Sequence, residues 1–319
     1  MARTRVIVQG LGPIGAGLAH AAAGDPSFAL VGAVDLDPDK IGEPVATFGA
    51  SAAGTVVASL GEALDRAGGA DVLLLATSSR AGAVASAVEE ALARGLHVVC
   101  TCEELAWPFD RHPALARRLD ERARAAGRGV VGTGVNPGFA MDQIVVAAAA
   151  ASHGVRAVRA ARAVDPRGRR AQFQAKVGLG LARAEFDARA AAGTLGHVGL
   201  AESGRLVAAG LDWTVARWDE RTEAVQPDAS APVAGVRQTL RGETADGRLL
   251  ELRFEAHTGV ARSADAIDID GTPPLRLRFE GGVGGEDATS ATVLRAARVI
   301  ASARPGLLTV LDLPLRPAP

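Results

Sequence analysis

The chain has 319 residues, 48% of them apolar, and this length and composition suit two domains of a compact protein better than a single core. Its 35 basic and 36 acidic residues nearly cancel and form no long block of one sign, which argues against a nucleic-acid-binding surface. No apolar stretch approaches the ~20 residues that cross a bilayer. The amino terminus already predicts a strand, so we expect a cytoplasmic protein with neither a membrane span nor a signal peptide.

A glycine-rich turn between a strand and a helix begins the chain. The apolar run at 5–9 leads into Gly10-Leu-Gly-Pro-Ile-Gly, and a helix-forming stretch follows. In such a turn, Gly10 permits the tight bend, Gly12 lets backbone N–H groups approach a pyrophosphate, and Gly15 lets the helix pack on the sheet. The alternative is a turn that serves packing alone. The predicted cofactor contacts here are Gly10, Gly12, Pro13, Ile14 and Gly15.

A second apolar run ends in Asp35, at the distance where an acidic side chain meets the ribose of a bound dinucleotide. A carboxylate there accepts hydrogen bonds from both ribose hydroxyls of NAD and repels the 2′-phosphate of NADP. Lys40 follows closely enough to reach such a phosphate. We therefore expect NAD or NADP as the cofactor, with NAD favoured by Asp35.

Short β-rich runs alternate with alanine-rich helical ones through the first 135 residues. The predicted strands are 5–9, 30–35, 71–76, 96–100 and 129–132, and the helices lie near 12–23, 80–93 and 112–126. This alternation predicts an α/β fold with a doubly wound parallel (Rossmann) sheet, which binds ligands beyond the carboxyl ends of its strands. The further cofactor candidates at those ends are Thr77, Ser78, Thr101 and Asn136.

From residue 136 the pattern changes to that of a second, α+β domain. Helices are predicted near 141–151, 184–192 and 196–209, and strands at 155–164, 233–241, 249–256 and 275–280. The last three strands alternate apolar and polar residues, which is typical of a mixed or antiparallel sheet with one wet face. We predict a dinucleotide-binding domain over 1–135, a substrate and dimerisation domain over 136–287, and a helix and tail over 288–319 that return to the first domain. Exposed strand edges favour a homodimer.

Glu103 is the candidate catalytic residue. It lies in Thr101-Cys-Glu-Glu104, directly after a predicted strand, and Thr101 and Glu104 have the spacing of a capping box, which predicts a structural role for Glu104. Glu103 has no such role; it either projects into the crevice or complements the helix dipole. The chain has no tyrosine and only two lysines, Lys40 and Lys176, so histidines and carboxylates must supply the acid–base groups.

Three other features allow two interpretations each. The Asn136 amide either binds the nicotinamide carboxamide or belongs to an interdomain hinge. Gln172, Gln174 and Lys176 alternate as on one face of a strand, which faces either the crevice or solvent. His197 either lines a pocket or simply begins a helix. The scattered histidines and the pair Cys100 and Cys102 lack the spacing of a metal site, and we expect no metal and no disulfide.

These motifs together resemble the 2,4-diaminopentanoate dehydrogenase family and the related native amine dehydrogenases, which share the architecture of dihydrodipicolinate reductase. The segments that carry the resemblance are 10–15, 101–105, 132–139, 174–180, 196–203 and 305–314. The resemblance implies NAD(P)-linked interconversion of an amine with a ketone or aldehyde plus ammonia, with Glu103 as the key side chain. We expect Phe139, Gln174 and His197 to contact the substrate. Arg295 stands where the family suggests asparagine, so the family's substrate is not implied.

Two alternatives remain at this point. One is an imine reductase of the dihydrodipicolinate type that acts without ammonia, although the paired-histidine-plus-lysine signature of that enzyme has no match in the chain. The other is a non-catalytic nucleotide-binding protein with the same fold.

Overall fold

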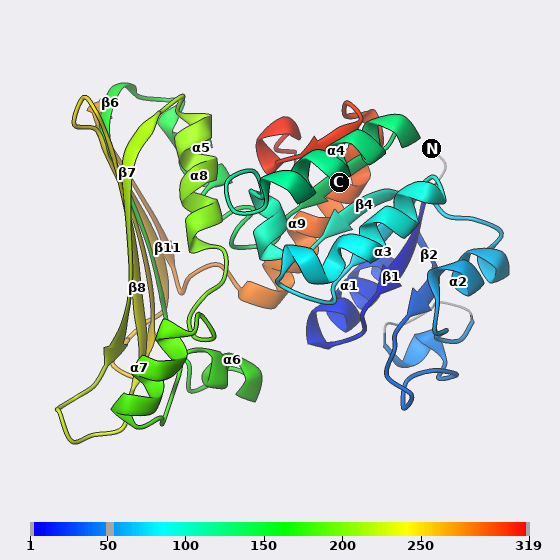
Figure 1. Ribbon diagram of the computed structural model, residues 1–319, viewed down its shortest axis with the longest axis horizontal. Coiled ribbons are helices and arrows are strands. Elements are labelled where there is room, and N and C mark those ends of the chain that lie inside the picture. The colour runs from blue at the N-terminus through cyan, green and yellow to red at the C-terminus, as the bar shows by residue number, and fades with distance from the viewer. Residues whose placement is uncertain (1–2, 49–53, 317–319) are drawn as a thin grey trace. The chain divides into compact units, whose positions relative to one another are not determined.

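The structure, a computed structural model, describes residues 3–48 and 54–316, and it divides into two compact units (Figure 1). Unit 1 comprises the described parts of Met1–Phe139 and Gly284–Pro319, and unit 2 is Ala140–Val283. The chain thus leaves unit 1 once and returns to it. Unit 2 is shorter at each end than the expected domain at 136–287.

Unit 1 is built on a parallel sheet of six strands. Along the chain these are β1 (Thr4–Gln9), β2 (Phe28–Val34), β3 (Val72–Leu75), β4 (His97–Cys100), β5 (Gly129–Gly132) and β12 (Gly306–Leu308). Their spatial order is β12-β5-β4-β3-β1-β2. From β1 the chain first adds β2 on one side and then adds β3, β4, β5 and β12 on the other side. Because β3, β4 and β5 are buried along their whole lengths, both faces of the sheet must be covered. The predicted doubly wound sheet is confirmed.

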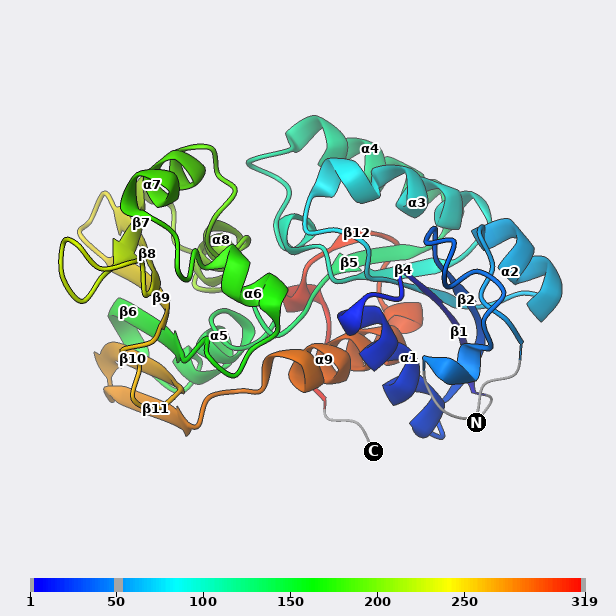
Figure 2. The same ribbon diagram turned by 90° about the horizontal axis from the view of Figure 1, so that it is seen from below.

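Helices cover the two faces of this sheet (Figure 2). On one face, α2 (Leu60–Ala67), α3 (Ala81–Ala93) and α4 (Pro113–Ala126) form a core with strand side chains such as Ile7 and Leu73. On the other face, α1 (Pro13–Gly24) packs beside α9 (Gly285–Val299). Short 3-10 turns complete the described elements: η1 (Val45–Thr47), η2 (Glu103–Ala106), η3 (Ile300–Ser302) and η4 (Val310–Asp312). None of the helices in the described ranges is long and apolar enough to cross a membrane.

Unit 2 is a mixed sheet with helices on one face (Figure 1). Its strands are β6 (His153–Val164), β7 (Val215–Val225), β8 (Gly235–Thr244), β9 (Leu249–His257), β10 (Ala264–Thr272) and β11 (Leu275–Glu280), in the order β11-β10-β6-β9-β8-β7. Only β6 and β9 pair in parallel in this described sheet. The helices α5 (Gln143–Ala149), α7 (Arg183–Ala191) and α8 (Leu200–Gly210) bury one sheet face, with Phe186, Leu240 and Leu252 in the shared core. The opposite face carries charged side chains, which confirms the predicted wet face.

Five elements differ from the prediction. Helix α2 and the three-residue β12 were not predicted, because neither is long enough to show a clear period. The edge strand β7, which has polar residues on both faces, was not predicted either, nor was β10, whose Ile267 and Ile269 do alternate with aspartates. Residues 171–176 form a short helix, α6 (Ala171–Lys176), and not a strand. The prediction that Gln172, Gln174 and Lys176 share a strand face is therefore wrong.

Candidate active site

The loops that follow the strands of unit 1 emerge side by side at one edge of its sheet. The residue that follows β1, β3, β4 or β5 still donates its N–H to a neighbouring strand: Gly10 to Val34 O (2.8 Å), Ala76 to Gln9 O (2.8 Å), Thr101 to Leu75 O (2.9 Å) and Thr133 to Cys100 O (2.8 Å). Neighbouring strands lie about 4.8 Å apart. The loops after β2, β1, β3, β4 and β5 therefore form a closely spaced row, which is the edge where sheets of this type bind ligands.

The glycine turn leaves open space at Gly12 and none at Gly15. A Cβ on Gly15 would lie 1.6 Å from the carbonyl oxygen of Gly10, so α1 packs directly against the turn. Gly10 has a φ of +90°, which favours glycine, and a Cβ there would lie 2.7 Å from Ala76 O. At Gly12 no atom of residues 3–48 and 54–316 lies within 4 Å of the position of a Cβ. The residues present therefore fit a ligand that approaches the backbone at Gly12.

The first turn of α1 offers backbone N–H groups to an anion. Pro13 begins the helix, no side chain caps it, and its first turn holds no acidic residue. Ile14 is partly exposed in this turn. Unsatisfied N–H groups and the positive end of the helix dipole together attract a phosphate. The predicted pyrophosphate contacts thus lie in a suitable environment.

The Asp35 carboxylate is held against the glycine turn. Its Oδ2 accepts from the Leu11 N–H (2.6 Å) and from Lys40 Nζ (3.2 Å), and its Oδ1 accepts from the Asp37 N–H (2.9 Å). Burial alone would raise the pKa of Asp35, but these hydrogen bonds outweigh it and hold the pKa below its usual value. An ionised carboxylate is therefore fixed at the end of β2, where a ribose would bind.

Leu36 lies in this region but is not among the predicted site residues. It directly follows Asp35, and its apolar side chain is 78% exposed. An apolar surface beside a ribose site suits the flat face of a base. The signal was present in the sequence as a leucine between two aspartates.

The two adjacent glutamates after β4 have different environments. The side chain of Glu104 is 4% exposed; its Oε1 accepts from Arg80 Nη1 (2.8 Å), and its Oε2 accepts from the Ala81 N–H (2.8 Å) and lies 3.0 Å from His112 Nε2. Burial would raise the pKa of Glu104, but the bonds from Arg80, Ala81 and His112 lower it overall. Glu104 therefore accepts a hydrogen bond from the first N–H of α3. The predicted capping box with Thr101 is wrong, because no side chain caps η2, but the structural role of Glu104 is confirmed.

Glu103 begins η2, and the backbone around it is fixed from two sides. The Glu104 N–H donates to Ser79 O, in the loop after β3, at 3.3 Å. Gly132, at the end of β5, packs so closely on η2 that a Cβ there would lie 2.4 Å from the carbonyl carbon of Leu105. Glu103 itself is partly exposed. A partly exposed carboxylate on a rigid turn at this edge is suited to proton transfer or to stabilising a cation.

Helix α9 supports the loop after β5. The Val135 N–H donates to Thr289 Oγ1 (3.2 Å), which itself donates to Gly285 O (2.7 Å). Asn136 is buried in this loop, and Phe139, at the end of unit 1, is partly exposed. Their roles as cofactor and substrate contacts stay predictions.

The remaining cofactor candidates lie in the same row of loops. Thr77 is exposed, and Ser78 and Thr101 are partly exposed. Ser78 Oγ accepts from the Arg80 N–H at 3.2 Å, so it orders the start of α3. Within the described ranges no group of three or more His, Cys, Asp or Glu side chains could hold a metal ion.

The other two substrate candidates belong to unit 2. The His197 N–H donates to Gln238 Oε1 at 2.5 Å, and its ring centroid lies 5.1 Å from that of Phe254. The amide of Gln174 donates to the carbonyl oxygens of Arg167 (3.3 Å) and Arg169 (2.8 Å), so it closes its own loop. Contacts with the sheet residues Gln238 and Phe254 thus fix the position of His197, whereas the amide of Gln174 stabilises its own loop. Substrate contact stays a prediction for both.

Arg295 packs inside unit 1. It is buried in α9, and its Nη1 lies 3.5 Å from the carbonyl oxygen of Pro314. The arginine that replaces the expected asparagine therefore supports the carboxyl-terminal segment.

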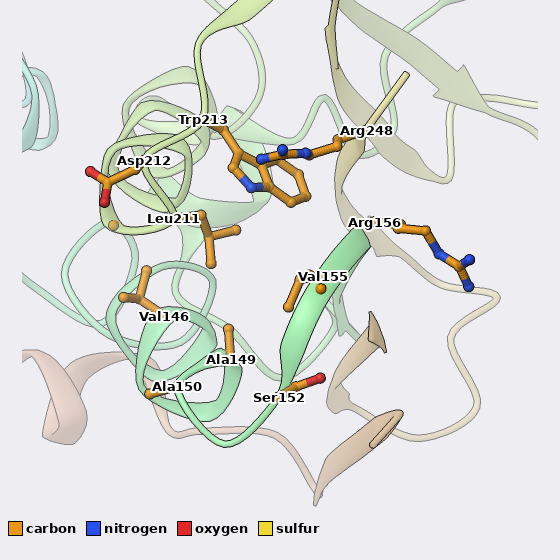
Figure 3. Close-up of a pocket in the computed structure, with 12 residues that line it drawn as sticks. Val146, Ala149, Ala150, Ser152, Val155, Arg156, Leu211, Asp212, Trp213 and Arg248 are labelled. Carbon is orange, nitrogen blue, oxygen red and sulfur yellow. The ribbon is translucent and has the colours of Figure 1, made fainter. Parts of the chain in front are cut away.

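A pocket of about 690 Å³ lies elsewhere in unit 2, between α5, β6 and the end of α8 (Figure 3). Its lining includes the indole of Trp213, with the guanidinium of Arg248 above it, 5.8 Å from a ring centroid. Arg248 pairs with Asp246 (2.9 Å) and Arg156 with Asp270 (3.2 Å). None of the predicted site residues is among the described residues that line this pocket, so it is separate from the candidate site.

Comparison with known proteins gives the family. Residues 139–318 match the model of the 2,4-diaminopentanoate dehydrogenase C-terminal domain. The chain belongs to the 2,4-diaminopentanoate dehydrogenase family. It is 27% identical over 339 aligned positions to the 2,4-diaminopentanoate dehydrogenase of Acetoanaerobium sticklandii, which covers 99% of this chain and 94% of that protein.

Solved structures show the same fold. The amine dehydrogenase from Mycobacterium smegmatis superposes with a TM-score of 0.84 at 22% identity, over 98% of this chain and 97% of that one. GenD2 of gentamicin A biosynthesis, solved in complex with NAD, superposes with a TM-score of 0.60 at 20% identity, over 98% and 90% of the chains. The family resemblance expected from the motifs is confirmed, together with a fold shared with dehydrogenases.

Proposed function

We propose that the chain is an NAD(P)-dependent amine dehydrogenase, which converts a ketone or aldehyde and ammonia into an amine and catalyses the reverse oxidation. Family membership supports an oxidoreductase, and the name of the Acetoanaerobium relative suggests a substrate that bears an amine. The observation that carries the proposal is Glu103, a partly exposed carboxylate on a rigid turn at the ligand-binding edge of unit 1.

The cofactor site proposed here is the glycine turn with Asp35. The backbone at Gly12 and the start of α1 would hold the pyrophosphate, and Asp35 would accept hydrogen bonds from the ribose. A bound nicotinamide cofactor supplies or accepts the hydride. Thr77, Ser78, Thr101 and Asn136 would complete the contacts along the row of loops.

Glu103 would act on the substrate. Ammonia adds to the carbonyl carbon, and loss of water then forms a cationic iminium, whose carbon accepts the hydride to give the amine. The Glu103 carboxylate stabilises this cation and, when protonated, gives the proton that the departing water needs. In the oxidative direction the carboxylate takes a proton from the ammonium form of the amine. Phe139, Gln174 and His197 are the residues proposed to contact the rest of the substrate.

The test is the dependence of the reaction on ammonium. Oxidation of NADH and NADPH is followed against short-chain and cyclic ketones and aldehydes, with and without ammonium, and isotope-labelled ammonium traces nitrogen into the product. We expect turnover only with ammonium and a labelled amine. Reduction of preformed imines without any use of ammonium would favour the imine reductase instead. Tight cofactor binding without any turnover would favour a non-catalytic protein.

We further propose a homodimer that forms through the uncovered face of the unit 2 sheet. One row of outward-facing residues alternates in charge across all six strands, in the order Asp219, Arg241, Glu251, Arg159, Asp268 and Arg276. A row of six alternating charges, turned end for end, meets the opposite charge at each position. The face is thus complementary to a second copy of itself, as a two-fold interface requires.

Light scattering tests the dimer. We expect twice the chain mass of 32.4 kDa for the wild type and a single chain mass after Arg159→Glu with Arg241→Glu. A wild-type mass of 32.4 kDa would contradict the proposal. We also propose a cytoplasmic location, which the free thiols of Cys100 and Cys102 favour and cell fractionation would test.

A further inference from the structure

Lys40 is the single lysine of unit 1, and its ammonium lies between two carboxylates at the proposed ribose site. The chain has 35 basic residues, of which only Lys40 and Lys176 are lysines. Lys40 Nζ lies 3.2 Å from Asp35 Oδ2 and 3.4 Å from Asp37 Oδ2. Its side chain is 26% exposed, whereas that of Asp35 is 12% exposed. The ammonium thus covers the outer side of the carboxylate that is proposed to bind the ribose.

An ordered turn holds the backbone of Lys40. The Lys40 N–H donates to Asp37 O (3.0 Å), and the Gly42 N–H donates to Val56 O (2.9 Å). The backbone position is therefore fixed, while the four-carbon side chain keeps its rotatable bonds. Its charged end can move between partners without any change in the turn.

The hydrogen bonds of Asp35 show what Lys40 occupies. An ionised carboxylate accepts about four hydrogen bonds, two on each oxygen. The Leu11 N–H and Lys40 Nζ fill Oδ2, and the Asp37 N–H takes one position on Oδ1. One acceptor position remains, enough for one ribose hydroxyl. If Lys40 moves away, a second position opens, and both hydroxyls of NAD can bind.

Lys40 also changes the charge that a 2′-phosphate meets. Without it, the phosphate of NADP, with a charge of about −1.5 to −2, would face both Asp35 and Asp37. With it, the same phosphate has an ammonium within reach, able to give a charge-assisted hydrogen bond. A compact, mobile point charge suits this exchange better than a planar guanidinium.

We propose that Lys40 sets the cofactor specificity of this chain. It turns from Asp35 to the 2′-phosphate when NADP(H) binds, and it leaves Asp35 to the ribose hydroxyls when NAD(H) binds, so the wild type accepts both cofactors. The inference rests on the nucleotide site proposed above and deepens it.

The test compares dissociation constants of NADH and NADPH by nicotinamide fluorescence and calorimetry, with 2′,5′-ADP and 5′-ADP as probes of the adenosine end alone. For Lys40→Met we expect NADPH and 2′,5′-ADP to bind about tenfold more weakly, in line with a charge-assisted hydrogen bond, and NADH to change by less than about threefold. Lys40→Arg should keep most of the NADPH affinity. Asp37→Asn, which removes a competing carboxylate, should strengthen NADPH binding.

Arg122→Met serves as a matched control, because it also removes one positive charge from unit 1, on α4, and should alter neither constant. Thermal melting of each variant verifies folding. Equal weakening of NADH and NADPH in Lys40→Met, or a wild type that binds NADH but not NADPH, would overturn the role of Lys40 and leave the proposed function standing. A wild type that binds neither cofactor would overturn both.

Discussion

Exchanging Glu103 and Glu104 for glutamine, one at a time, should separate catalysis from stability at two adjacent positions. Both residues follow β4, but only Glu104 is buried, with its carboxylate bonded to Arg80, Ala81 and His112. Glutamine keeps the shape of the side chain and replaces one acceptor oxygen with an NH₂ group that cannot accept. The effect of each change on stability then depends on how deeply the carboxylate is buried.

For Glu104→Gln the loss is worked from those contacts. With its NH₂ group in place of Oε2, glutamine leaves the buried Ala81 N–H without an acceptor; with the NH₂ group in place of Oε1, two donors face each other at Arg80. Either orientation leaves a buried polar group unsatisfied, at about 1–3 kcal/mol. The Arg80 pair adds less than about 1 kcal/mol, because the Arg80 side chain is 47% exposed. We expect a free energy of unfolding lower by about 1–4 kcal/mol, and a melting temperature lower by about 2–16 °C.

For Glu103→Gln we expect the reverse pattern. Glu103 is partly exposed, so the free energy of unfolding should change by less than about 1 kcal/mol. Ammonium-dependent oxidation of NADH should fall by about 10²–10³, the usual effect of losing one such electrostatic interaction in a transition state. Cofactor binding, measured by fluorescence, should remain.

The assays are urea unfolding and the ammonium-dependent oxidation of NADH, both on the full chain. Urea unfolding is measured at several pH values to test the role of the Glu104 carboxylate. Because the pKa of Glu104 lies below its usual 4.5, its contribution to stability is complete above that pH and is lost as the pH falls through the lowered value. The gap between wild type and Glu104→Gln should therefore narrow only below about pH 4.5. Wild-type turnover in Glu103→Gln, or wild-type stability in Glu104→Gln, would refute the reasoning.

Gly12→Ala and Gly15→Ala form a second matched pair. The methyl group of Gly12→Ala has open space, so this variant should melt as the wild type does but bind NADH at least about tenfold more weakly. The methyl group of Gly15→Ala would lie 1.6 Å from a carbonyl oxygen, so this variant should destabilise unit 1. Equal melting and equal affinities would contradict both expectations. Burial lowers the pKa of His97, whose neutral ring accepts a backbone N–H, so the melting temperature should fall as the pH drops below 6.5, and His97→Gln should flatten that slope. If the melting temperature of His97→Gln falls with pH as steeply as that of the wild type, groups other than His97 cause the dependence. Arg162→Met leaves the buried Asp265 carboxylate without its partner at 2.9 Å and should lower the free energy of unfolding by about 3–5 kcal/mol. Adding Asp265→Leu to the same chain should restore most of this loss. Chemical unfolding in which the double variant is no more stable than Arg162→Met would contradict the expectation.

The sequence alone determined the parts of this protein that depend on neighbouring residues. The glycine turn, the parallel sheet and the wet face of the second sheet are all visible as local periods and as glycines at fixed spacing. A strand of β-rich residues between helical runs has few other ways to fold, so the order of elements also indicated which loops share an edge. Glu103 was placed at that edge from its distance to β4 alone.

The tertiary structure decided which of these local signals are used. Glu104 and Thr101 have the spacing of a capping box, yet Glu104 bonds the start of α3, more than twenty residues earlier in the chain. Asp265 pairs with Arg162 across two strands that are 103 residues apart, and Lys40 reaches back to Asp35 through a turn without any regular period. Such contacts join segments that are distant in the sequence or irregular. Their geometry depends on how the whole unit packs, and a local hydrophobic period does not predict that packing.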